Sequence, residues 1–400
     1  MKFKQKLFTD TKASIYDLRR KNFYRPTFAF YIYLTIFILF IVTIINHNSK
    51  ILTQQIRLTA QLTDGVYSST SDEELVSLRQ QLRLQAFQYY RLIEMQHLED
   101  GMIVNRDENG TAIDICDSLL FSSLYYVSLK KLGFESAAEN TWYAIKNSKN
   151  GAQWLRHPKC LKPTSRDMLL GLLVALSQEP EDYKEITSNL FTAISKYGDK
   201  FGPGPFYVSR LSPGIIAYLN AFAKQHRIFQ NNFETKKIKT PGFSTNEFFS
   251  VLTESGYTAH LVALLTWLEM ELIEKNSLQK KITRVHTVLD TFGSKNILSK
   301  QRIMWISYQL TQIDSQNIFF QWLWLNSIQI LNPQLEKSLL KRLLDPSVFP
   351  VDRLPNNCDR SADYLWQRDS REYTSENTHC TRFFSGVDFL WMAALLLNVD

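Results

Sequence analysis

SDEELVSLRQQLRLQAFQYYRL, residues 71–92, decides the fold class of this 400-residue chain. Ser71 and Glu74 match a capping box, in which the serine hydroxyl accepts from the third-residue amide and the glutamate reaches back. Apolar side chains then recur at helical spacing to about residue 98: Leu75, Leu78, Leu82, Leu84, Phe87, Tyr90 and Leu92. The stretch therefore predicts one long amphipathic helix.

The same helical period continues toward the C-terminus. It predicts further helices over 114–131, 135–147, 166–177, 181–197, 212–226, 245–254, 258–275, 279–291, 299–312, 317–331, 333–344 and 385–398. Glycines stand at expected helix ends and prolines at expected helix starts: Gly133, Gly198, Gly293, Pro180, Pro213 and Pro333. The run FYVSRL (206–211) is the main segment that alternates with a period of two. The sequence therefore predicts an all-α protein.

About twelve helices in consecutive hairpins fit either a solenoid or a closed toroid of six hairpins. A solenoid usually shows a sequence period of about 30 to 45 residues, and none is found here. A toroid also explains why the longest irregular stretches separate hairpins: 101–113, 148–165, 198–211, 227–244 and 345–384. We expect these connections to gather at one end of an (α/α) toroid and to form a polar cleft.

The N-terminus carries a membrane signal. Eight basic and two acidic residues precede TFAFYIYLTIFILFIVTII (27–45), which has no charge. This span is long enough to cross a bilayer core of about 30 Å. It ends in Ile44 and Ile45 without a small-residue cleavage site, so we expect an uncleaved anchor. The alternative is a buried core helix.

The anchor divides the chain into four parts. These are a basic cytoplasmic segment (1–26), the transmembrane anchor (27–46), a stalk with the long helix (47–100) and an exported toroid-like domain (101–400). The positive-inside rule predicts a single-pass protein of the inner membrane with a periplasmic or extracytoplasmic C-terminal domain. The formal net charge of +7 comes almost entirely from the first 26 residues. The charge therefore indicates topology and does not indicate a nucleic-acid partner.

All four cysteines lie in the exported part, which fits an oxidising compartment. We predict the disulfides Cys116–Cys160 and Cys358–Cys380, because each pair would tie a polar loop to a neighbouring helix. The competing interpretation is zinc bound through His157 and Cys160, or through His379 and Cys380. Neither spacing is that of a recognised zinc finger, so we expect no metal and no cofactor.

Two polar clusters share a ring, a cation and a carboxylate. The first is WLRHPKCLKPTSRD (154–167), and the second is WQRD (366–369) in the long connection before the last helix. Further acidic residues stand at expected helix starts: Asp114, Asp117 and Asp388. Each of these, like Asp167 with its neighbour Arg166, has an alternative interpretation as a residue that only stabilises a helix N-terminus.

With DICDS, WLRHP, SRD, WQRD and SGVD placed between helical hairpins, residues 110–400 resemble the six-hairpin toroids of polysaccharide-degrading enzymes. The resemblance implies that two of Asp117, Asp167 and Asp369 act as general acid and general base. It also implies substrate-binding residues, with Trp154 and Trp366 as sugar platforms and three arginines for an acidic sugar: Arg156, Arg166 and Arg368, beside Asp114 and Asp388. A lyase variant would use His157 as the base.

The sequence leaves a second function class open. The same helical domain could be a non-catalytic scaffold or binding component of an envelope secretion or polysaccharide-export assembly, since one fold hosts both classes. The expected partners are the membrane through residues 27–46 and either a polysaccharide or an envelope protein.

Overall fold

A computed structural model describes the part of the chain that follows the stalk. All described residues belong to one compact unit, Tyr67–Asp400. They are 71–107, 109–113, 115–150, 153–197, 200–201, 209–210, 213–228, 257–283, 294–315, 317–346, 382–383 and 385–398. The predicted anchor at 27–46 lies outside them. Within the described ranges, no helix has both the length and the apolar character needed to cross a membrane.

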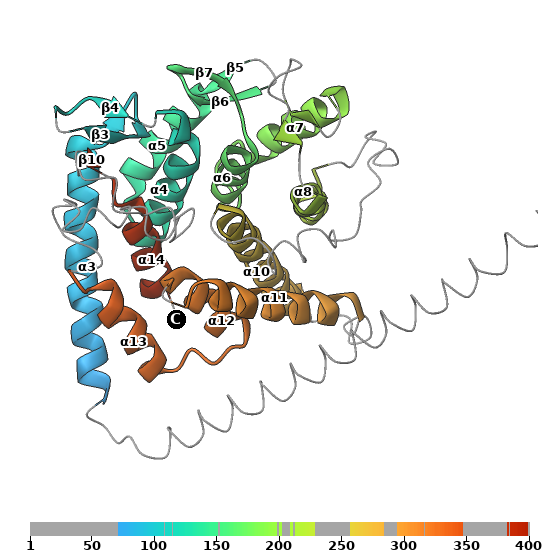
Figure 1. Ribbon diagram of the computed structural model, residues 1–400. Coiled ribbons are helices and arrows are strands. Elements are labelled where there is room, and N and C mark those ends of the chain that lie inside the picture. The colour runs from blue at the N-terminus through green and yellow to red at the C-terminus, as the bar shows by residue number, and fades with distance from the viewer. Residues whose placement is uncertain are drawn as a thin grey trace, which may run out of the picture. The chain divides into compact units, whose positions relative to one another are not determined.

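The described chain is largely helical, as predicted. Its α-helices are α3 (Ser71–Gln96), α4 (Ser118–Leu132), α5 (Glu135–Asn147), α6 (Arg166–Leu176), α7 (Tyr183–Tyr197), α8 (Pro213–Gln225), α10 (Tyr257–Thr283), α11 (Ser294–Ile313), α12 (Ile318–Ser327), α13 (Pro333–Leu343) and α14 (Val387–Leu397) (Figure 1). The long helix expected from residue 71 is therefore present as α3.

Helix ends follow the local sequence. Gly133 ends α4 in the left-handed conformation, with φ of 80°, and its amide bonds back to the last turn. Pro333 begins α13, where Asn332 accepts from the amide of Leu335 at 2.9 Å. The predicted break near 276–278 is wrong, because α10 continues to Thr283 through a stretch without glycine or proline. The helix expected at 245–254 lies outside the described residues.

Short antiparallel strand pairs lie in three of the expected irregular connections, 101–113, 148–165 and 198–211. The strands are β1 (Leu98–Glu99), β2 (Met102–Ile103), β3 (Asn105–Asp107), β4 (Ala112–Ile113), β5 (Lys149–Asn150), β6 (Gln153–His157), β7 (Cys160–Pro163), β8 (Lys200–Phe201), β9 (Ser209–Arg210) and β10 (Arg382–Phe383). Their pairings are β1 with β2, β3 with β4 and β10, β6 with β5 and β7, and β8 with β9. The expectation of irregular chain at 101–113 and 148–165 is therefore wrong.

For β1, β2 and β4 the physical reason is strand length, whereas β6 and β7 are longer but lie in a segment without clear alternation of apolar and polar residues. Two-residue strands are too short to show an alternation, so the turn is the only signal that such a hairpin leaves. Asp100 and Gly101 form the two-residue turn between β1 and β2, with φ of 51° and 76°. Two positive φ values are what a type I′ turn requires, and Asp-Gly is a preferred pair for it.

Three helices form the centre of the packing. Helix α4 packs on α5, α6 and α14; α14 packs on α3 and α13; and α10 packs on α6, α8, α11 and α12. Figure 1 shows α14 between α3 and α4. Residues 387–396 of α14 are all buried, and they belong to a core that reaches every described helix from α3 to α14. The C-terminal helix is therefore enclosed by helices from the start of the domain.

Candidate functional site

Helices α4 and α14 begin close to the β1–β4 hairpins, and α6 begins beside the start of α4. The Ser118 hydroxyl, in the first turn of α4, donates to the carbonyl of Ile103. Two residues along, the Asn105 side chain accepts from the amide of Ser385, just before α14, at 3.2 Å. The amide of Leu120 lies 3.3 Å from the sulfur of Met168 in the first turn of α6. We call this region the hairpin end of the domain.

Asp117 at the start of α4 forms an ion pair with a strand residue. Its carboxylate lies 3.9 Å from Nη1 of Arg156, and the same nitrogen donates to the Cys116 carbonyl at 3.4 Å. Both side chains are partly exposed. Asp117 occupies the N-cap position of α4, and no side-chain capping bond forms there. Its carboxylate therefore faces a cation and not the helix amides.

A disulfide fixes this ion pair to the fold. Cys116, in the 3₁₀ turn η1 (Ile115–Asp117), is bonded to Cys160 at the start of β7, as predicted. Arg156 lies on β6, which pairs with β7, so the disulfide links the strands that carry the arginine to the turn that carries Asp117. The second predicted disulfide, Cys358–Cys380, lies outside the described residues.

Asp167 lies in the first turn of the neighbouring helix α6. Its side chain is buried, and it accepts a hydrogen bond from the hydroxyl of Ser165. Ser165 is the N-cap residue but makes no capping bond, because its hydroxyl is used by the carboxylate. The amides at a helix N-terminus also favour a negative charge there. Arg166, the other predicted member of this pair, is exposed.

Asp388 occupies the corresponding position of α14. Gly386, with φ of 77°, precedes the helix, and the Asp388 carboxylate accepts from the amide of Phe389 at 2.9 Å. Asp388 is almost completely buried. This geometry agrees with the interpretation of a helix-start residue.

Two further predicted site residues lie in the interior. Trp154 is buried in the main core cluster, so packing accounts for its position. His157 is also buried, and both of its ring nitrogens bond to backbone: Nδ1 accepts from the amide of Lys159, and Nε2 donates to the carbonyl of Glu99, each at 3.0 Å. Burial lowers the pKa of His157, and the bond to Glu99 opposes that shift only in part. His157 therefore joins two hairpins as a neutral ring.

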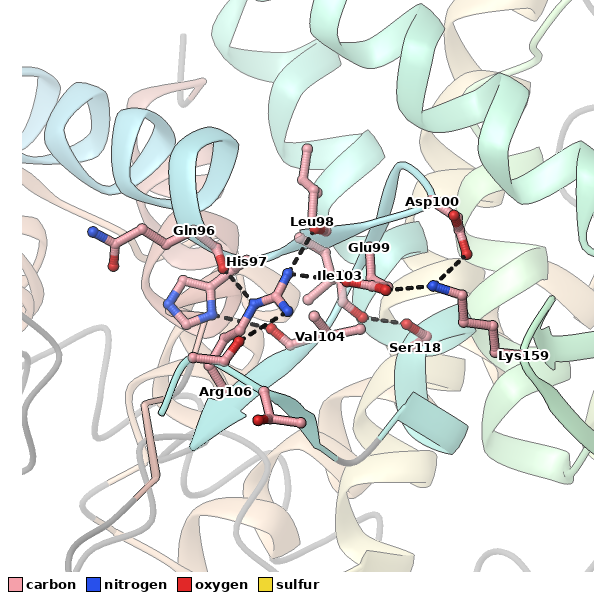
Figure 2. Close-up of polar contacts among 12 residues, drawn as sticks. Gln96, His97, Leu98, Glu99, Asp100, Ile103, Val104, Arg106, Ser118 and Lys159 are labelled. Carbon is pink, nitrogen blue, oxygen red and sulfur yellow. Dashed lines mark hydrogen bonds and ion pairs between the residues drawn. The ribbon is translucent and has the colours of Figure 1, made fainter. Parts of the chain in front are cut away.

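Figure 2 shows a polar network that sequence reasoning missed, in which Arg106 and Lys159 both contact the Glu99 carboxylate. Arg106 donates to the carbonyls of Gln96 and Leu98 at 2.8 and 2.9 Å, and to the Glu99 carboxylate at 3.2 Å. Lys159 forms ion pairs with Glu99 and Asp100. The hydrogen bond from Lys159 lowers the pKa of Glu99. The Asp-Gly turn at 100–101 was the one local signal of this network.

The disulfide excludes one of the two ligand pairs of the zinc interpretation, namely His157 with Cys160. The sulfur of Cys160 is held in the disulfide, so it is not a thiolate that could bind metal beside His157. In the ranges that the structure covers, no group of histidine, cysteine and acidic side chains is placed to hold a metal ion. Several predicted site residues lie outside those ranges: Asp114, Trp366, Arg368, Asp369 and His379.

Comparison with known proteins assigns neither a family nor a function to this chain. No protein family matches this sequence, and no curated protein matches it. The candidate site therefore depends on its own residues, namely Asp117 and Asp167 at the starts of two helices in contact and Arg156 on β6.

Proposed function

We propose that this chain is a membrane-anchored envelope protein whose helical domain cleaves polysaccharide at the hairpin end. One observation carries the proposal. Asp117 and Asp167 stand at the starts of α4 and α6, whose first turns touch through Leu120 and Met168, and Arg156 lies beside Asp117. Two carboxylates and a cation are the groups that cleavage of an acidic glycan uses.

The two aspartates have different surroundings, which suggests different roles. The guanidinium of Arg156 lies 3.9 Å from the partly exposed Asp117 carboxylate, and we assign Asp117 the role of general base. Asp167 is buried and oriented by Ser165, and we assign it the role of the second carboxylate of the pair. Arg156 would also neutralise a sugar carboxylate that approaches the pair. Asp369 remains a predicted third candidate.

The closed (α/α) six-hairpin arrangement is part of the same proposal. Its support is that the last helix, α14, packs on α3 and α4 at the start of the domain, while α4, α6 and α10 follow one another in contact. In such an arrangement the starts of the inner helices share one end, where a substrate meets them. The anchor at 27–46 would hold the domain in the envelope.

A second candidate function is a non-catalytic binding or scaffold protein of the envelope. The observation that favours it is the interior position of Trp154 and His157, which occupies both residues in packing and backbone bonds. Under this alternative, Asp117 and Asp167 serve only the local structure of their helices.

The test uses the full chain, purified in lipid nanodiscs, with a panel of acidic and neutral polysaccharides. New reducing ends report cleavage of either kind, and new ultraviolet absorbance from an unsaturated sugar distinguishes a lyase from a hydrolase. Release of reducing ends from at least one acidic glycan is the expected result. Saturable glycan binding without any new ends would contradict cleavage and would favour the scaffold.

A further inference from the structure

Helix α3 has two apolar faces on opposite sides. The core face packs against α13 and α14, and its residues are almost fully buried: Leu82, Ala86, Tyr89 and Ile93. The outer face carries large apolar side chains in contact with solvent: Val76 (53% exposed), Leu84 (68%), Phe87 (49%) and Met95 (65%). We call these four residues the outer stripe.

The four members of the outer stripe share one side of the helix, with exposed polar and charged residues between them. At about 100° per residue, its four members fall within an arc of about 100°. The core-facing residues of α3 are centred on the opposite side of the helix. In the described part of the chain, the one other large hydrophobic residue with comparable exposure is Tyr143 on α5, at 64%. An exposed apolar patch confined to one helix face marks an interaction surface.

The charged residues within the stripe indicate which kind of surface covers it. Glu73, Arg91 and Glu94 lie in the same arc and are exposed, so both signs are present. A helix that lies on an anionic lipid surface is instead rich in lysine and arginine on its polar side. The outer stripe therefore fits a protein surface better than a membrane surface.

We propose that the outer stripe pairs with the outer stripe of a second copy of this chain, with the two α3 helices antiparallel. The stripe is self-complementary about the midpoint between residues 85 and 86. A two-fold axis through that point places Val76 opposite Met95 of the second copy, and Leu84 opposite Phe87. An interface between two identical subunits requires this reciprocal pairing.

Repulsion between like charges disfavours a parallel pair of helices and so favours the antiparallel orientation. In it, Arg91 lies opposite Gln80 of the second copy, and Glu94 lies opposite Ser77, so no like charges meet. In a parallel pair with the same register, Arg91 would face its own copy, and Glu94 likewise, which is unfavourable. The proposal goes beyond polysaccharide cleavage and does not depend on it.

One helix face is a small interface, so the pair is expected to be weak in dilute solution. Photo-crosslinking of the full chain in membranes captures such contacts. A photoreactive benzoylphenylalanine in place of Leu84 should give an adduct of twice the chain mass that contains only this chain. Peptide mapping should place its attachment near Phe87. The same group in place of Val76 should attach near Met95.

The matched control places the photoreactive group at Tyr143, which is equally exposed but lies off the stripe. It should give no self-adduct. In the Val76 crosslinking protein, Leu84→Glu should abolish the adduct while Tyr143→Glu should leave it unchanged, and both should keep the parent unfolding midpoint. Three results would each overturn the antiparallel pair. They are adducts formed only with other proteins, attachment of position 84 to position 84 of the second copy, and an equal yield of self-adduct from the group at Tyr143.

Discussion

Replacing Gly171 with alanine probes the contact between the two helices that begin at the candidate site. Gly171 lies in α6 beside Leu120 of α4. A Cβ atom at residue 171 would lie 2.7 Å from the Cα of Leu120 and 3.1 Å from its Cδ1. Carbon atoms normally approach to about 3.5 Å or more, so the helices would have to separate by a substantial fraction of an ångström.

The expected magnitude is the balance of two effects. Alanine in place of glycine stabilises a helix interior by about 1 kcal/mol. Overpacking a tight contact costs about 1–3 kcal/mol, and here the obstructing atom belongs to the backbone and cannot rotate away. Because the backbone atom cannot give way, we take the upper part of that cost, about 2–3 kcal/mol, and expect Gly171→Ala to lower the free energy of unfolding by about 1–2 kcal/mol.

The assay is urea unfolding followed by circular dichroism, and a double variant sharpens it. Leu120→Ala removes Cδ1 but leaves the Cα, so it should not restore the stability lost by Gly171→Ala. An increased unfolding free energy in Gly171→Ala, or full rescue by Leu120→Ala, would refute the close backbone approach of α4 and α6.

Two further perturbations concern the strands that carry Arg156. Cys116→Ser with Cys160→Ser opens a loop with a sequence separation of 44 residues. By loop entropy this should cost about 4 kcal/mol of unfolding free energy in urea, and an unchanged value would contradict a structural disulfide. Because burial lowers the folded-state pKa of His157, the unfolded chain binds more protons below the ordinary histidine pKa of about 6.5, so stability should fall as the pH drops through that value. His157→Gln should reduce this pH dependence of the urea midpoint, whereas an identical slope in both proteins would argue against the neutral buried ring.

The helical class was predictable because each helix buries one face, and the apolar residues of a buried face recur in the sequence at helical spacing. The period of α3 and the stop at Gly133 were both readable. The Cys116–Cys160 pair was also predictable, since both cysteines border one polar segment. The hairpin of β1 and β2 was missed because two-residue strands carry no period, although Asp100-Gly101 was a usable turn signal. Strands β6 and β7 are longer, but their segment contains two prolines and shows no clear alternation.

The interior positions of Trp154 and His157 could not be predicted from local sequence. Both lie in a polar segment with two prolines, which indicates surface loop, yet the strand β6 directs them into packing. The contact between two helix N-termini also depends on residues that are far apart in the sequence. The contact between Leu120 and Met168 joins residues 48 positions apart, and no local pattern specifies it.

The most direct test of the site measures turnover by Asp117→Asn and Asp167→Asn in the full chain, on the glycan that the wild type cleaves. Glu139→Gln on α5 is the control, because it removes the same charge from an exposed position. An amide keeps the shape of the side chain but does not exchange a proton at neutral pH. We expect each aspartate variant to lose turnover by about 10²-fold or more while its unfolding free energy changes little, and Glu139→Gln to match the wild type. Retained turnover in both aspartate variants, or losses that follow their unfolding free energies, would contradict a catalytic pair at the starts of α4 and α6.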